Sequence, residues 1–320
     1  MKRIRIDQTG EPEVMRLEEA QAPSPGPGQV LVRIQAAGVN PVDTYVRAGS
    51  YGYSPQVPYT PGADGAGVVE AVGPGVTKVR VGDRVYGGRS VSGSYAEQAI
   101  FDEIQVYPLP DNSTFAQGAC LGIPYGTACR ALLQKARVKL GETVLIHGAS
   151  GGVGSAAVQV AKAEGVTVIG TAGSEEGKRL AKEQGADPLL DHRDLGHFDE
   201  VMRITKGAGV NLILEMLANQ NLANDLKILA PFGRVVVIGS RGAIEIDPRE
   251  AMQRDASILG MVLKNTPPRE LQQIHAYIGV GLQQGTLRPV VGREFPLAQA
   301  PQAHRAVMTP PAYGNIVLIP

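Results

Sequence analysis

The chain has 320 residues, 43% of them hydrophobic and 19% charged, the composition of a soluble protein long enough for two domains. Its 31 basic and 31 acidic residues cancel, which argues against a basic field that would gather nucleic acid or an anionic membrane. The longest apolar runs fall far short of the roughly 20 residues of a membrane span, and the basic start lacks the apolar segment of a signal peptide.

The first part of the chain, residues 1–121, is rich in glycine, proline and β-branched residues and shows little helical periodicity. Three apolar segments bounded by turn residues predict short strands at 29–39, 65–73 and 82–88. The run VGPGVTKVRVGDRV (72–85) resembles a hairpin. These features predict an antiparallel, β-rich domain.

From residue 122 onward, strand-like and helix-like segments alternate. The predicted strands are nearly continuous apolar runs, which is typical of a parallel sheet that helices cover on both faces. We expect strands at 143–147, 166–172, 187–191, 211–216, 234–240 and 257–263, and helices at 155–165, 175–185, 198–207 and 223–233. The sequence therefore predicts a doubly wound α/β fold of the Rossmann type.

After a further helix expected at 268–285, the tail returns to strand and short-helix character. We expect this tail to rejoin the β-rich domain, which would make that domain discontinuous. The predicted division is a β-rich domain of residues 1–121 and 264–320 and a nucleotide-binding domain of residues 122–263.

The run HGASGGVG (147–154) stands between the first predicted strand of the sheet and the helix that follows it. Gly148, Gly151 and Gly154 would allow a tight turn, a close approach of a pyrophosphate and close packing of helix on strand. The N-terminus of the helix offers N–H groups to phosphate, and Ser150 would add a hydroxyl donor. A glycine triplet alone would also suit a flexible loop, but within strand–helix units it indicates dinucleotide binding.

The end of the second strand favours NADPH over NADH. An NAD site usually carries an acidic residue there for the ribose 2′-hydroxyl, whereas residues 170–174 read GTAGS. Lys178, Arg179 or Arg193 would supply positive charge for a 2′-phosphate. The acidic pair at 175–176 weakens this reading, and Lys178 or Arg179 would equally suit a solvated helix face.

The sequence argues against a zinc site. Tetrahedral zinc needs three or four grouped Cys, His or carboxylate ligands, and the two cysteines, Cys120 and Cys129, are isolated from each other. We expect His147 to pack or hydrogen-bond at the end of its strand, and His275 and His304 to lie on surface helices. Two cysteines and no export signal favour a reducing cytoplasm.

Five segments together resemble the medium-chain dehydrogenase/reductase superfamily, and most closely its zeta-crystallin type of NADPH:quinone oxidoreductase. They are GVNPVDTYVRAGSY, PYTPGADGAG, AVGPGVTKVRVGDRV, HGASGGVG and EMLANQNL. The resemblance implies a GroES-like catalytic domain joined to a Rossmann domain, with NADPH and substrate meeting in the cleft between the domains.

Zinc-bearing relatives place ligands where this chain has other residues. Asn40 stands at the position of a cysteine ligand, Ala63 replaces a histidine and Asp64 replaces the adjacent glutamate. The resemblance therefore implies the metal-free branch. Relatives commonly carry a Gly-Lys pair before the final strand, where this chain reads Gly314-Asn315, so we expect no cofactor contact from the tail.

The resemblance also implies a set of cofactor contacts. Ser150, Gly151, Gly152, Val153 and Gly154 would meet the pyrophosphate, and Gly173, Ser174, Lys178 and His192 would surround the adenosine phosphate. Asn221 and the run Ile238, Gly239, Ser240 and Arg241 would line the nicotinamide side, and Tyr45 would reach the cofactor from the catalytic domain.

The catalytic residues expected are Asn40, Tyr45, Tyr51 and Asp64. Tyrosine rings would stack on a flat quinone, and a hydroxyl would bond its oxygen. Tyr53 and Tyr59 more simply pack their loop. Asn40 and Asp64 are polar candidates, for which a structural role in a turn is equally open.

Two other functions stay open at this point. A reductase of activated C=C bonds in enones or alkenals would use the same fold, cofactor and hydride. A crystallin-like or AU-rich-RNA-binding role is implied by relatives, but zero net charge and the lack of an aromatic–basic motif disfavour RNA. The resemblance further implies a homodimer or homotetramer, in which edge strands of the nucleotide domains pair, with 257–263 as the candidate edge.

Overall fold

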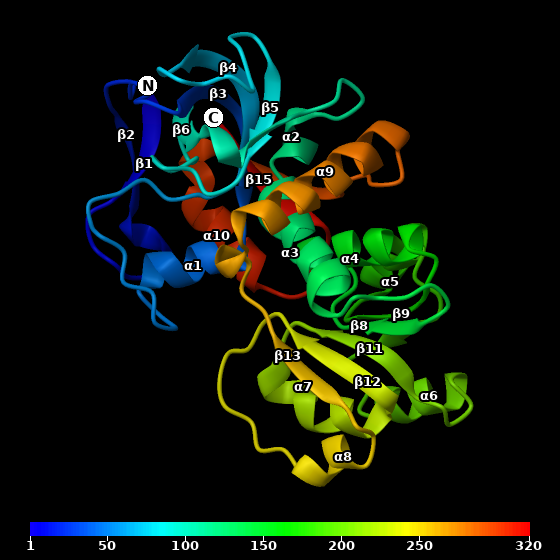
Figure 1. Cartoon of the computed structure of the whole chain (residues 1–320). Helices are drawn as coiled ribbons and strands as arrows, with labels where there is room; N and C mark the ends of the chain where they lie inside the picture. Colours follow the sequence, from blue (N-terminus) through cyan, green and yellow to red (C-terminus); the bar gives the residue numbers. More distant parts are fainter. The chain divides into compact units, whose positions relative to one another are not determined.

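A computed structural model describes all 320 residues, and the chain divides into two compact units (Figure 1). The first unit comprises Met1–Pro124, His275–Pro310 and Gly314–Pro320, and the second comprises Tyr125–Ile274 and Pro311–Tyr313. The C-terminal tail thus belongs to the first unit, apart from three residues.

The first unit is built on an open sheet in the strand order β14-β15-β3-β4-β5-β7, with β6 pairing β3. A separate antiparallel pair, β1 and β2, accompanies it. Its strands are β1 (Lys2–Ile6), β2 (Met15–Glu19), β3 (Gln29–Val39), β4 (Gly65–Val72), β5 (Arg84–Gly87), β6 (Gln98–Asp102), β7 (Val106–Pro108), β14 (Val291–Pro296) and β15 (Asn315–Ile319). Its helices are α1 (Pro41–Ala48), α2 (Phe115–Gly118) and α10 (Ala300–Met308).

The tail completes this sheet. β15 lies between β14 and β3 in the sheet, and its residues pair antiparallel with the end of β3. Burial of aliphatic residues on the inner face stabilises the sheet, because Val30, Val32 and Ile34 of β3 and Leu318 of β15 belong to one hydrophobic cluster.

The second unit is a six-stranded parallel sheet in the order β10-β9-β8-β11-β12-β13. This is the order 3-2-1-4-5-6 of the doubly wound nucleotide-binding fold. Its strands are β8 (Thr143–Ile146), β9 (Thr167–Ala172), β10 (Leu189–Asp191), β11 (Val210–Glu215), β12 (Leu229–Val237) and β13 (Ser257–Gly260). Its helices are α3 (Gly126–Cys129), α4 (Gly152–Ala163), α5 (Glu175–Glu183), α6 (His197–Ile204), α7 (Ala218–Asp225) and α8 (Pro248–Met252).

Burial on both faces explains why these strands are apolar throughout. Leu145 and Ile213 belong to one cluster with residues of α6 and α7. Their neighbours Val144, Ile146 and Leu212 point to the opposite face, because side chains alternate along a strand, and they are fully buried as well. The expected α/β fold class with a doubly wound parallel sheet is confirmed.

Several boundaries differ from the expectation, three of them with a clear cause or consequence. The helix predicted at 223–233 instead spans Ala218–Asp225, since the apolar stretch from Leu229 extends β12. The last strand ends at Gly260 rather than residue 263. Residues 264–274 group with the second unit, because backbone carbonyls of Asn265 and Glu270 accept hydrogen bonds from side chains of the helical segment 130–135.

The longest helix, α9 (Pro268–Gln284), has 17 residues. No helix of the structure is both long enough and apolar enough to cross a membrane.

Candidate functional site

The three glycines of the turn after β8 each occupy a distinct local environment. Gly148 has φ +61°, the left-handed conformation that allows the chain to reverse directly after the strand. A Cβ on Gly154 would lie 2.0 Å from the carbonyl oxygen of Gly148, so only glycine lets α4 pack this closely. A Cβ on Gly151 would meet nothing nearer than 3.5 Å, which leaves its backbone open to approach.

This turn leads directly into the N-terminus of α4. Gly151 precedes the helix, and Gly152, Val153 and Gly154 form its first turn. Backbone N–H groups in a first helical turn, together with the helix dipole, favour an anionic group in front of them. The turn therefore has the open backbone and the helix N-terminus that suit a diphosphate group.

Ser150 lies in the same turn, but its hydroxyl has a protein partner. Ser150 Oγ donates to the carbonyl oxygen of Ala312 over 2.8 Å, and the residue is buried. This hydrogen bond holds the segment Pro311–Tyr313 against the glycine turn. Contrary to the expectation of a free donor for phosphate, the Ser150 hydrogen is directed at a main-chain oxygen.

The residues predicted for the adenosine phosphate gather at the end of β9. The ring of His192 lies over Gly173, since a Cβ there would be 2.7 Å from His192 Nε2. Ser174 caps α5, accepting from the Gly177 N–H over 3.0 Å. Lys178 Nζ lies 2.7 Å from Glu175 Oε1 and 3.9 Å from an oxygen of Asp191. Gly173, Ser174 and His192 thus adjoin one another, and Lys178 is drawn toward two acids.

Asp191, which sequence reasoning did not single out, organises the charge here. It ends β10, the neighbour of β9, and binds Arg193 through two contacts of 3.0 Å and 2.7 Å. The Arg193 guanidinium holds the pKa of Asp191 well below its usual range. The available signal was an acid at the end of the third strand, followed by a basic residue two positions later.

The residues predicted for the nicotinamide side lie at the ends of β11 and β12. The backbone carbonyl of Glu215 accepts from the N–H groups of Ile238 (2.9 Å) and Gly239 (3.2 Å). The Glu215 carboxylate accepts from Asn221 Nδ2 over 3.3 Å. Farther along, the Arg241 N–H donates to Asn219 Oδ1 over 2.8 Å, and Ser240 Oγ donates to Gly242. Asn221 and the run 238–241 are thus brought to one edge of the sheet.

His147, Glu215 and Asp225 form a buried cluster beside these residues. His147 Nε2 lies 2.8 Å from Asp225 Oδ1 and 3.5 Å from Glu215 Oε2. Burial raises the pKa of both carboxyl groups and lowers the pKa of His147. One ligand atom from each of the three lies within 4.8 Å of the others, a spacing that could hold a metal ion.

In the first unit, Asn40 and Asp64 are in direct contact. Asn40 Nδ2 donates to Asp64 Oδ2 over 3.0 Å, and the same oxygen accepts from the Ile123 N–H over 2.8 Å. Asp64 is fully buried, and burial raises its pKa to about 8. The other oxygen, Oδ1, has no hydrogen-bond partner and faces Gly88 and Gly122. The pair joins the start of α1 to the start of β4.

Tyr45 and Tyr51 form an edge-to-face pair whose ring centres are 4.8 Å apart. Tyr51 is 57% exposed, whereas Tyr45 is partly buried on α1. Both line a pocket of about 430 Å³ within the first unit, together with residues of α1 and α10 that include Arg47 and Met308. Asn40 and Asp64 are not among the residues that line this pocket.

Two histidines expected on surface helices are buried instead. His275 is 5% and His304 1% exposed, and each faces a tyrosine hydroxyl, Tyr86 at 3.0 Å and Tyr95 at 3.1 Å. Both helices are amphipathic, so each histidine lies on the inner face. Burial lowers the pKa of both rings to about 3, which keeps them neutral.

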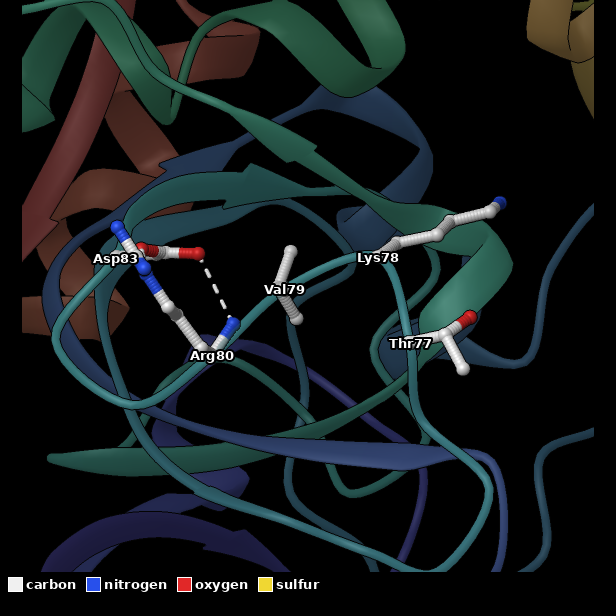
Figure 2. A pocket seen from close by; sticks show the side chains of 5 residues that line it. All are labelled: Thr77, Lys78, Val79, Arg80 and Asp83. Carbon is white, nitrogen blue, oxygen red and sulfur yellow. Dashed lines mark hydrogen bonds and ion pairs between the residues drawn. The ribbon is translucent and has the colours of Figure 1, made fainter.

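Two further features lie apart from the predicted site residues. Figure 2 shows a surface pocket of about 330 Å³ lined by residues 77–80 and Asp83, in which the Arg80 N–H bonds to Asp83. Asn315 donates to the carbonyl oxygen of Val290 through its backbone N–H and its side-chain amide, both at 2.9 Å. Asn315 therefore anchors β15.

Comparisons with known proteins agree in both units. Residues 26–111 match the alcohol dehydrogenase GroES-like domain, and residues 152–278 match the family described as zinc-binding dehydrogenase. A quinone oxidoreductase of Rattus norvegicus is 48% identical over 96% of this chain and 94% of its own length.

Solved structures extend this likeness. Quinone oxidoreductase from Escherichia coli, complexed with NADPH, superimposes with a TM-score of 0.91 at 29% identity over the full length of both chains. CurK enoyl reductase superimposes with a TM-score of 0.90 at 26% identity, over 99% of this chain and 98% of its own. The chain belongs to the medium-chain dehydrogenase/reductase superfamily and, within it, to the quinone oxidoreductases of the zeta-crystallin type.

Proposed function

We propose that this chain is an NADPH:quinone oxidoreductase that works without zinc. The observation that carries the proposal is the turn 147–154. There Gly148 reverses the chain, Gly151 leaves the backbone accessible, and Gly154 allows α4 to pack closely against the turn. The 48% identity to the quinone oxidoreductase of Rattus norvegicus supports a quinone as the electron acceptor. Bound NADPH would supply a hydride from C4 of its nicotinamide ring.

The second unit would bind and orient the nucleotide. The N–H groups of Gly152, Val153 and Gly154 would face the diphosphate, and Ser150 would fix the turn through Ala312. Gly173, Ser174, Lys178 and His192 would surround the adenosine phosphate. Asn221 and residues 238–241 would hold the nicotinamide side.

The first unit would contribute the aromatic surface for the acceptor. Tyr45 and Tyr51 present adjoining rings, and Tyr45 would also meet the cofactor. Flat, electron-poor quinones suit stacking on such rings. Reduced quinone oxygens take protons from water, so the reaction needs no strong general acid.

The preference for NADPH over NADH rests on the end of β9, which carries no acid for a ribose 2′-hydroxyl. Lys178 and Arg193 stand nearby, although Asp191 contacts both of them. The direct test is to measure dissociation constants for both nucleotides by titration. An equal or tighter constant for NADH would contradict the proposed cofactor.

We expect no catalytic zinc, because the residues at the positions where the resemblance would place zinc ligands are poor ligands. A carboxamide, Asn40, occupies the cysteine position and is engaged with Asp64. Burial raises the pKa of the nearby Cys120 thiol, which keeps it protonated and a poor ligand. Turnover should therefore survive prolonged treatment with a chelator, and loss of turnover that zinc restores would refute this part.

An enone or alkenal reductase is the second candidate, favoured by the likeness to CurK enoyl reductase. NADPH oxidation measured side by side with 9,10-phenanthrenequinone, 1,4-quinones and short enones separates the two. A higher kcat/KM for the quinones is expected. A preference for enones would replace the quinone reductase by this candidate. Catalysis, rather than RNA binding or a bulk crystallin role, is the function we propose.

We further propose a cytoplasmic homo-oligomer. Both cysteines are free and buried, which suits a reducing compartment. β13 is an edge strand that pairs only with β12, and its Ile258 is 40% exposed. An unpaired edge with an exposed apolar side chain is a surface on which a second copy can extend the sheet.

A further inference from the structure

The buried cluster of His147, Glu215 and Asp225 connects two segments of the second unit that the nucleotide would use. His147 immediately precedes the glycine turn, Glu215 ends β11, and Asp225 ends α7. β8 and β11 are neighbours in the sheet, and α7 follows β11 (Figure 1). The cluster therefore lies between the diphosphate turn and the nicotinamide-side residues.

Glu215 contacts both nicotinamide-side segments, which are also bonded to each other through Ala218 and Gly239. Its Oε1 accepts from the Leu217 N–H and from Asn221 Nδ2. Its backbone carbonyl accepts from the N–H groups of Ile238 and Gly239. One residue thus fixes the start of α7 through its side chain and the end of β12 through its main chain.

The rest of the cluster surrounds the second oxygen of the Glu215 carboxyl group, Oε2, which has no hydrogen-bond partner of its own. His147 Nε2 lies between Asp225 Oδ1 and Glu215 Oε2, at 2.8 Å and 3.5 Å. His147 itself is confined by the ring of His197, whose centre is 6.1 Å from its own, and by Phe198 at 6.0 Å. All three cluster residues are at most 3% exposed, so water cannot replace a lost contact.

We propose that Glu215 is a positioning residue that orients the nicotinamide half of the nucleotide through Asn221, with His147 and Asp225 fixing its carboxyl group. This inference rests on the proposed function, since it names how the same nucleotide site is held. Partners that lock a binding side chain in one rotamer set how accurately the bound ring is placed.

The test compares the whole nucleotide with its adenosine half, using NADPH and 2′,5′-ADP as probes. Glu215→Ala removes the acceptor for Leu217 and Asn221, and we expect the Kd for NADPH to rise about tenfold, the loss of one buried hydrogen-bond anchor. The Kd for 2′,5′-ADP should change less than about twofold. Glu215→Gln keeps an acceptor oxygen, and its amide can donate to Asp225, so it should restore NADPH binding.

The matched control is Glu200→Ala, which removes a partly exposed carboxylate paired with Arg203 on α6. It should change neither constant. Should Glu215→Ala fail to fold, Asn221→Ala decides instead, because it leaves the cluster intact and should produce the same selective loss of NADPH.

Three results would overturn the inference: equal losses for both probes, no loss for NADPH, or Glu215→Gln behaving like Glu215→Ala. Each would mean that Glu215 serves the fold alone. If the unaltered chain bound no NADPH, both the proposed function and this inference would be refuted. The unaltered protein therefore separates the two failures.

Discussion

The side-chain amide of Asn40 donates to Asp64 Oδ2 over 3.0 Å in the interior of the first unit. An amide and a carboxyl group thus meet where α1 begins and β4 follows. Because Asp64 is fully buried, its contact with a neutral amide gives little compensation for a negative charge. The protonation of Asp64 then becomes part of the stability of the protein.

The contribution of Asp64 to stability should fall as the pH rises from about 4 to about 8. Burial raises the pKa of Asp64 to about 8, so the folded state keeps a proton that the unfolded state has lost over this range. One such group lowers the free energy of unfolding by up to about 1.4 kcal/mol for each unit that the pH rises. Asp64→Asn carries no titrating proton, so its unfolding free energy, measured in urea at several pH values, should fall less steeply. Equal slopes for the two proteins would contradict the prediction.

Gly154→Ala should abolish nucleotide binding. The added methyl would lie 2.0 Å from the Gly148 carbonyl oxygen, so the turn or α4 must shift. Gly279→Ala is the matched control, because a Cβ there meets nothing within 4 Å in a helix. It should raise the unfolding free energy by about 0.5–1 kcal/mol and leave binding unchanged. Normal NADPH titration of Gly154→Ala would argue against the turn as the diphosphate site.

Tyr51→Ala should raise KM for a quinone by about 2- to 13-fold with a smaller effect on kcat. The reason is the loss of an aromatic contact of roughly 0.5–1.5 kcal/mol. Tyr51→Phe keeps the ring beside Tyr45 and should remain within about twofold of the parent. Steady-state kinetics decide the matter. A large effect of Tyr51→Phe would show that the hydroxyl, not the ring, matters.

Asp191→Asn should tighten NADPH binding about fivefold, because it releases Lys178 and Arg193 from the carboxylate that now contacts both. NADH, which lacks the 2′-phosphate, should gain much less. Lys178→Ala should act in the opposite direction and weaken NADPH alone. Fluorescence titration with both nucleotides measures the ratio. A parallel change for NADPH and NADH would place these charges away from the 2′-phosphate.

Ile258→Lys should shift the proposed oligomer toward monomers. Ile258 lies on β13, whose outer edge has no partner strand in the chain, and a lysine there opposes pairing with a second copy. Sedimentation velocity across a concentration series gives the oligomeric state. If the parent is already a monomer, or the variant assembles unchanged, this edge is not the interface.

Local chemistry explains what the sequence determined by itself. Glycine spacing at 148, 151 and 154 identified the turn, because absence of a Cβ is a property of each residue. Continuous apolar runs identified the parallel strands, because burial on both faces leaves no polar position. The helix after β11 was placed too late, since the stretch from Leu229 continues as a strand where the prediction ended a helix.

Only the tertiary structure decided which groups meet. Asp191 contacts the Lys178 and Arg193 cations because β10 lies beside β9, and His147 meets Asp225 because β8 lies beside β11. His275 and His304 are neutral because their helices turn them inward, not because of their neighbours in sequence. Pairing and burial depend on strand order and helix rotation, and these are set by the packing of the whole chain rather than by any local pattern.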